Sequence, residues 1–289
     1  GNLNSFRIKA RQDVPKLSPE EDDMLTFVSS FVPGKRIHEL AILSEIIEVG
    51  EVKLDRFKEY DQESVRSAVR VLSGEYHTDN TLKNHPCWAV IQVDGDVIKP
   101  SPKFAEALRN EEFVGYARDA VECGLEINKT DYSDCDSLGF QRYHKYTRAD
   151  VCRILNWDSD YSSTIYGYRI RNNQCPIFVT YNKSEDISST TKYVEGFESR
   201  SVFDWMTRSN LTLESTEVRN ILNAERSGMD VLLFVKKSDS EGSDFYYLGK
   251  VTPIASEARE TTIEDKPIVG IPLRLDEPLS EEIYNYMTT

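Results

Sequence analysis

The sequence contains no stretch that approaches the roughly 18 consecutive apolar residues of a membrane-spanning helix. Its first residues, 1–11, also lack the charged and then apolar order of a secretory signal peptide. These absences argue against a membrane or secreted protein and predict a cytoplasmic one. The chain opens on Gly1-Asn2 with no initiator Met, which indicates a fragment of a longer protein.

Recognisable metal-binding and catalytic motifs are missing as well. The five cysteines are separated by 36, 12, 17 and 23 residues without a Cys-x-x-Cys pair, and the four histidines are scattered. There is no Gly-x-x-x-x-Gly-Lys-Ser/Thr phosphate loop, no Gly-x-Ser-x-Gly elbow and no His-x-Lys pair. We therefore expect buried free thiols, no metal or other cofactor, and no catalytic activity in this chain.

Positive charge is scarce, because 35 Lys and Arg stand against 49 Asp and Glu, for a net charge of −14. This balance argues against a general nucleic-acid binder. Residues 140–226 are the exception, with 12 cations and 11 anions interleaved with many aromatic residues. That composition is expected where phosphates are gripped and bases are stacked, although the same rings would also suit the core of a sheet.

The composition that remains is ordinary for a globular protein, with 39% hydrophobic and 29% charged residues over 289 positions, enough for one large or two smaller domains. A polar, turn-rich stretch at 126–137 is the predicted boundary, which gives domains at 1–137 and 138–289. The predicted fold class is α+β: a helical N-terminal domain with a winged-helix-like hairpin, then a barrel-like, strand-rich C-terminal domain with inserted helices.

In the first domain, Ser18-Pro19 and Asp61 are predicted to begin helices. Two strand-like runs around Asp94-Gly95 predict a β-hairpin. Helices followed by a hairpin outline a winged helix, with residues 61–73 in the recognition position. Few cations lie on that helix, so we expect a linker or docking domain rather than a DNA reader.

In the second domain, Thr147 is predicted to cap a helix over 148–155 and Ser215 another over 215–225. Segments 164–170 and 175–181 are predicted to form a hairpin. Further strands are predicted at 201–206, 231–236, 245–251 and 268–275, before a last helix near 280–286.

Several short sequence motifs in this region resemble those of a known family. They include Tyr146-Thr-Arg-Ala-Asp-Val-Cys-Arg-Ile-Leu-Asn-Trp157, Cys175-Pro-Ile-Phe-Val-Thr-Tyr181, Lys183-Ser-Glu-Asp-Ile187 and Trp205-Met-Thr-Arg-Ser209. From about residue 139 to the end, the chain resembles the domain of unknown function that ends many bacterial phospholipase-D-like nuclease/helicase fusions, type IV restriction enzymes among them. Asn182 departs from the His expected there in many relatives.

The resemblance implies a target-recognition module that binds double-stranded DNA containing 5-methylcytosine or 5-hydroxymethylcytosine. Cleavage and ATP hydrolysis would reside in upstream helicase and nuclease domains of the parent chain. We assign DNA contacts to the cations and hydroxyls of three polar segments: Lys145, Arg148, Lys183, Ser184, Arg208 and Ser209. A modified-base pocket for a flipped cytosine is assigned to two rings and two carboxylates: Tyr181, Trp205, Glu185 and Asp186.

Three alternatives stay open. Trp205 and Tyr181 could be core residues. The chain could be a protein-interaction module that docks on the helicase part and touches DNA little. A magnesium-dependent nuclease using Lys183, Glu185 and Asp186 is disfavoured, because such enzymes usually assemble carboxylates from separated strands.

Overall fold

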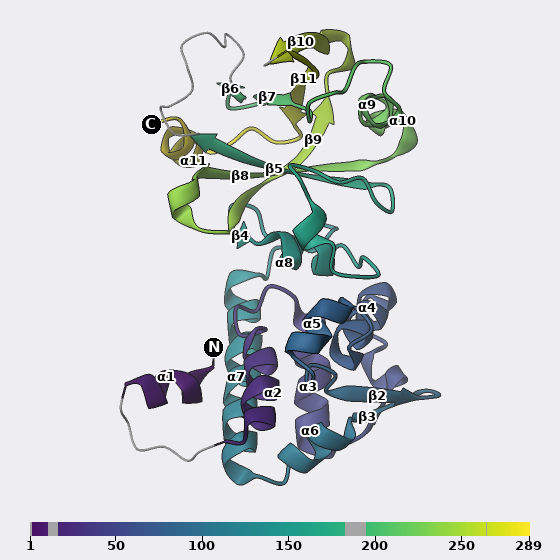
Figure 1. Ribbon diagram of the computed structural model, residues 1–289, viewed down its shortest axis with the longest axis vertical. Helices are drawn as coiled ribbons and strands as arrows, with labels where there is room; N and C mark the ends of the chain where they lie inside the picture. Colours follow the sequence, from purple (N-terminus) through teal and green to yellow (C-terminus); the bar gives the residue numbers. More distant parts are fainter. Residues whose placement is uncertain (1, 11–16, 183–194, 264) are drawn as a thin grey trace. The chain divides into compact units, whose positions relative to one another are not determined.

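The computed structural model describes residues 2–10, 17–182, 195–263 and 265–289, and it divides into two compact units (Figure 1). Unit 1 comprises Gly1–Gln141 and Cys152–Tyr161, and unit 2 comprises Arg142–Val151 and Ser162–Thr289. The division thus assigns Cys152–Tyr161, which lies beyond the predicted boundary at 137, to the N-terminal unit. It falls within helix α8 (Arg148–Ile154).

Unit 1 is helical with a small three-stranded antiparallel sheet of order β1-β3-β2. The long helix α7 packs against α2 and α3, and α3 also packs against α4 (Figure 1). Its elements are α1 (Leu3–Lys9), α2 (Pro19–Ser29), α3 (Ile37–Val49), β1 (Val52–Lys53), η1 (Leu54–Phe57), α4 (Gln62–Ser73), α5 (Asp79–Asn84), β2 (Ile91–Asp94), β3 (Val97–Pro100), α6 (Pro102–Ala107) and α7 (Glu111–Asp131).

The predicted starts of these elements are confirmed by local hydrogen bonds. Ser18 and Glu21 form a capping box, in which the Ser18 hydroxyl accepts from the Glu21 N–H at 3.1 Å and the Glu21 carboxylate accepts from the Ser18 N–H at 2.7 Å. The Asp61 carboxylate accepts from the Ser64 N–H at 2.7 Å at the start of α4. The hairpin is confirmed too, with Asp94 paired to Val97.

The predicted boundary loop at 126–137 is partly helical, which corrects the expectation. Helix α7 continues to Asp131, and its polar side chains there hydrogen-bond to backbone carbonyls of the helix itself and of the loop after α2. The Asn128 amide donates to the Gly34 carbonyl at 2.7 Å, and the Thr130 hydroxyl donates to the Glu126 carbonyl at 3.1 Å. A polar composition therefore marked an exposed helix end rather than a loop.

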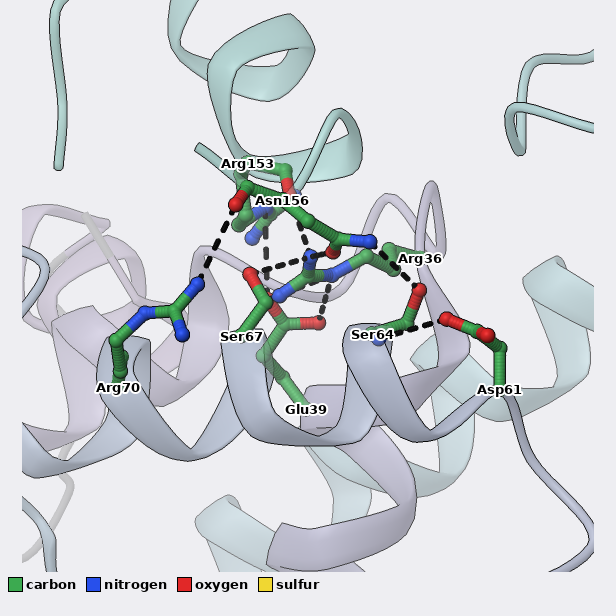
Figure 2. A network of polar contacts seen from close by, with 8 residues as sticks. All are labelled: Arg36, Glu39, Asp61, Ser64, Ser67, Arg70, Arg153 and Asn156. Atoms are coloured by element: carbon green, nitrogen blue, oxygen red, sulfur yellow. Dashed lines mark hydrogen bonds and ion pairs between the residues drawn. The ribbon is translucent and has the colours of Figure 1, made fainter. Parts of the chain in front are cut away.

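A network of polar contacts covers one side of α4 (Figure 2). The Arg36 guanidinium donates to Glu39 at 2.5 Å and to the Ser67 hydroxyl at 3.1 Å. The Asn156 amide donates to the Ser64 hydroxyl at 3.1 Å, and Arg70 donates to the Asn156 carbonyl at 3.3 Å. These α4 side chains therefore bind the segment Cys152–Tyr161 of unit 1. Because they already have these partners, they are not available to contact a DNA duplex.

Unit 2 contains a mixed sheet whose strand order is β5-β8-β9-β11-β7-β6, with β10 added on β11 and β4 on β9. Only β5 and β8 pair in parallel among these strands. Its elements are β4 (Lys145–Tyr146), η2 (Ser162–Thr164), β5 (Gln174–Asn182), β6 (Gly196–Ser199), β7 (Val202–Met206), α9 (Thr216–Leu222), α10 (Ala224–Ser227), β8 (Asp230–Ser238), η3 (Asp239–Glu241), β9 (Phe245–Pro253), η4 (Ala255–Glu257), β10 (Arg259–Ile263), β11 (Lys266–Leu275) and α11 (Glu281–Thr288).

The sheet bends where β9 changes partner. Its first half pairs with β8, whereas Val251–Pro253 pair with β11. The register between β8 and β9 shifts beside Gly249, whose φ of +122° is a conformation that favours glycine. The strand path ends at β5 and β6 without pairing them, so the described strands form a bent open sheet and not a closed barrel.

Two local predictions in unit 2 were wrong. Segment 164–170 makes only isolated bridges, such as Tyr168 to Ile177, instead of a strand. The helix predicted over 215–225 is two short helices, α9 and α10, and the Ser215 hydroxyl accepts from the Thr212 N–H rather than capping α9.

All five cysteines are free thiols, and three of them are buried: Cys87, Cys152 and Cys175. Cys123 is exposed, which corrects the expectation that every thiol is buried. No helix among the described residues is both long and apolar enough to cross a membrane.

Candidate nucleic-acid interface

The two edge strands of the unit 2 sheet, β5 and β6, approach each other through side chains. Tyr181 near the end of β5 is half-buried, and its ring centroid lies 5.6 Å from that of Phe197 on β6. A methyl group added at Gly196 would lie 3.3 Å from the Tyr181 ring, so the absence of a side chain there admits the ring. We call this meeting of Tyr181 with Gly196 and Phe197 the seam.

The seam continues onto helix α11. The Phe197 ring lies 5.9 Å from that of Tyr284, and burial together with Tyr284 raises the pKa of the Tyr181 hydroxyl. Beside Tyr284 lies a solvent-open hollow of about 650 Å³, large enough for a nucleobase. It is lined by Glu198, Ser199, Arg200, Ser201, Pro278 and Tyr284.

A buried carboxylate lies at the same place in the sheet. Asp204 is 8% exposed and stands directly opposite Gly196 in the pairing of β7 with β6. Side chains of directly opposed residues share a face of the sheet, so Asp204 and the Tyr181 ring are both neighbours of Gly196. One Asp204 oxygen is paired with Arg259, and the other, Oδ1, is buried without a hydrogen-bond partner among the described residues.

Asp204 was missed by the sequence reasoning, although a signal for it exists. It is the only charged residue in the apolar run Val202-Phe-Asp-Trp-Met206. A carboxylate in such a run is costly to bury unless it has a partner, so it indicates either an ion pair or a ligand site.

The structure places Trp205 in the hydrophobic core and not on an open surface. It is 2% exposed, and the Tyr168 ring contacts it edge to face at a centroid distance of 5.0 Å. Because Trp205 and Asp204 alternate along β7, they point to opposite faces of the sheet. This corresponds to the core alternative that the sequence left open.

Arg208 and Ser209 follow directly after β7, and both are exposed. The Arg208 guanidinium lies over the Tyr168 ring at 4.7 Å and donates to the Glu217 carboxylate at 2.5 Å. Arg208 is therefore near the surface as predicted, but it already has an anionic partner.

Lys145 and Arg148 lie on aromatic rings elsewhere in unit 2. The Lys145 ammonium is 4.5 Å from the Tyr246 ring centroid and 3.9 Å from the Glu241 carboxylate. The Arg148 guanidinium lies 5.0 Å from the Phe245 centroid, and burial lowers its pKa. Its Nε has no hydrogen-bond partner in the part of the chain that the structure describes. Lys183, Ser184, Glu185 and Asp186 lie outside the described residues.

Residues 140–287 match a protein family described as "Domain of unknown function (DUF3427)", and residues 1–133 match "Domain of unknown function (DUF8090)". No curated protein matches the chain. Among solved structures, one described as "DNA modification-dependent restriction endonuclease AspBHI" is 15% identical, with 43% of this chain and 70% of that chain covered and a TM-score of 0.29.

A second structure, described as "crystal structure of KRYPTONITE in complex with mCHG DNA and SAH", is 9% identical, with 89% of this chain and 44% of that chain covered and a TM-score of 0.34. At these TM-scores neither likeness establishes a shared fold. The match over residues 140–287 spans more than half of the chain, which therefore belongs to the family described as a domain of unknown function, DUF3427.

Proposed function

We propose that unit 2 recognises double-stranded DNA containing 5-methylcytosine or 5-hydroxymethylcytosine, and that the seam receives the modified base. The observation that carries this proposal is the buried Oδ1 of Asp204, which no residue in the described ranges hydrogen-bonds, beside Gly196, where the Tyr181 ring also lies. A carboxylate oxygen accepts from the amino group of cytosine, and a ring supplies a stacking surface for a base taken out of the duplex.

The cations of unit 2 support the same function. Lys145, Arg148 and Arg208 each lie over an aromatic ring, which holds a long side chain in place at the surface. Held cations bind phosphates with a smaller loss of side-chain freedom. They would provide affinity without discrimination between bases.

The remaining elements of the proposal rest on the sequence resemblance. We propose that the chain acts as the target-recognition part of a type IV restriction enzyme similar to SauUSI, with nuclease and helicase domains upstream. In that arrangement this chain recognises the modified DNA, and the other domains cleave the DNA and hydrolyse ATP.

The full chain is expected to bind a cytosine-methylated duplex more tightly than the matched unmethylated duplex. One buried methyl group contributes on the order of 1 kcal/mol, so we expect about a fivefold preference from the methyl contact alone. This preference is measured by fluorescence anisotropy titrations at fixed salt, with methylated, hydroxymethylated and unmodified duplexes of one sequence. The full chain is needed, because a cut at 137 would separate Cys152–Tyr161 from the rest of unit 1. Equal affinity for all three duplexes contradicts the proposed function.

Replacing Tyr181 with alanine is expected to remove most of the methyl preference while weak, salt-sensitive binding remains. The ring would contribute about 1–3 kcal/mol of stacking on the base, whereas phosphate contacts would be unaffected. Tyr181→Phe is the matched control, since it retains the ring and should retain the preference. A Tyr181→Ala protein with full preference would place the base elsewhere.

One observation favours the competing docking function for unit 1. An apolar hollow of about 440 Å³ lies between α1, α2 and α7, lined in part by Leu3, Leu25, Val32 and Ala120. Leu3 and the neighbouring Phe6 and Ile8 are exposed apolar side chains. A docking module of this kind would touch DNA little, so equal affinity for all three duplexes in the titration would favour docking over recognition.

A further inference from the structure

Tyr168, Arg208 and Glu217 form a cluster at the surface of unit 2, contributed by three different segments of the chain. Tyr168 is 2% exposed, and its buried hydroxyl lies close to Arg208 and Glu217 but has no well-formed hydrogen bond within the described part of the chain. Burial raises the pKa of the Tyr168 hydroxyl well above its usual value, and the Glu217 carboxylate adds to that rise. The hydroxyl therefore keeps its proton and stays available as a donor, since no well-placed acceptor faces it among the described residues.

Arg208 connects this buried donor to solvent. Its guanidinium lies 4.7 Å from the Tyr168 ring centroid and donates to the Glu217 carboxylate at 2.5 Å. The side chains of Arg208 and Glu217 are 44% and 30% exposed. The Trp205 ring packs edge to face against the Tyr168 ring and holds it in place. The Tyr168 hydroxyl and the Arg208 guanidinium therefore present a rigid pair of donors to any anion that replaces the Glu217 carboxylate.

We propose that Tyr168 and Arg208 form a subsite for one backbone phosphate of DNA, and that the Glu217 carboxylate occupies this subsite when no DNA is bound. The inference rests on the proposed DNA recognition. It adds that the Glu217 carboxylate competes with the DNA phosphate for the subsite. Carboxylate and phosphate are both oxyanions, and a guanidinium binds either through parallel N–H groups. The phosphate would also accept from the Tyr168 hydroxyl, which the carboxylate does not satisfy.

The charges around the subsite are consistent with this exchange. The neighbouring ion pair, between Glu214 just before helix α9 and Arg219 on that helix, is exposed and internally balanced. With Glu217 in place, Arg208 is neutralised as well, and displacement of Glu217 would expose one positive charge to the phosphate. Because an exposed ion pair of this kind is worth only about 0–1 kcal/mol, a phosphate can compete with it.

Replacing Glu217 with glutamine is expected to increase the affinity for methylated and unmethylated duplex alike, by about two- to fivefold, because the competing anion is removed. The slope of log K against log salt should stay the same, because the phosphate contacts Arg208 in both chains once DNA is bound. Glu217→Gln/Arg208→Ala should lose the increase in affinity. The ratio of methylated to unmethylated affinity should stay unchanged, since a phosphate carries no information on the base.

The matched control is Glu214→Gln, which removes the same charge three residues earlier in the chain, from the ion pair with Arg219. It should leave the affinity almost unchanged. An equal increase in both variants would show a general charge effect and overturn the subsite, as would an unchanged affinity in Glu217→Gln.

A measurement without DNA separates this inference from the proposed function. Inorganic pyrophosphate is titrated into the full chain, and tryptophan fluorescence is followed, because Trp205 contacts Tyr168. Glu217→Gln should bind the anion more tightly than the unchanged chain, and Arg208→Ala should show no response from Trp205. A response that survives in Arg208→Ala would overturn the subsite even if the chain prefers methylated duplex. If the chain shows no methyl preference but this response is present, only the recognition function fails.

Discussion

Glu39→Ala is expected to lower the free energy of unfolding of unit 1 by about 3–5 kcal/mol, because it leaves a buried cation without its counter-charge. Glu39 is 0% exposed and lies between Arg36, at 2.5 Å, and Arg153, at 3.7 Å (Figure 2). Arg36 is itself only 7% exposed, and Glu39 is the carboxylate with which it is ion-paired. Urea unfolding followed by circular dichroism measures the loss.

The matched control is Glu45→Gln, in the pair that Glu45 forms with Arg56 at the surface. That pair joins the same atom types at 2.8 Å, but the Arg56 side chain is 63% exposed, so we expect a loss of no more than about 1 kcal/mol. Equal small losses in both variants would show that the buried network does not stabilise unit 1.

The same network predicts a pH dependence. Burial alone would raise the pKa of Glu39, but Arg36 and Arg153 outweigh it, so the pKa lies below its usual value. A lowered pKa means that the stabilisation is present above the pKa of the unfolded chain and is lost as the pH falls through the folded pKa. The difference in stability between the unchanged chain and Glu39→Gln should therefore shrink on acidification below about pH 4.

Trp205→Ala is expected to destabilise unit 2 by about 3–5 kcal/mol, through the cavity left in the core. The indole is 2% exposed, lies against Tyr168, and stands opposite Ile271 in the pairing of β7 with β11. Thermal unfolding of the variant measures the effect. Tyr166→Ala is the control, because Tyr166 is 69% exposed and its removal should change stability by less than about 0.5 kcal/mol.

The outcome for Trp205 also decides its role. A Trp205→Ala chain with full stability but no methyl preference would show that Trp205 belongs to the base pocket, as the sequence predicted. A chain that melts far lower makes Trp205 a core residue, and leaves Tyr181 and Asp204 as the groups at the seam that could meet a base.

The sequence by itself determined the features that depend on near neighbours in the chain. Ser18 and Asp61 begin helices where expected, since each side chain accepts from an N–H within the following turn. The Asp94-Gly95 hairpin depends on a turn of a few residues, and the strands at β7, β8, β9 and β11 follow from short apolar runs. All of these signals act over a distance of a few residues.

Only the tertiary structure decided which of the candidate residues lie together. Asp204 gains its position beside Tyr181 from the pairing of β7 with β6, and Arg208 gains Glu217 from a helix that begins further along the chain. Trp205 is buried because apolar side chains from other strands and helices of unit 2 pack around it in the core on that face of β7. Burial and ion pairing depend on partners supplied by distant segments, and a local pattern contains no information on which segments those are.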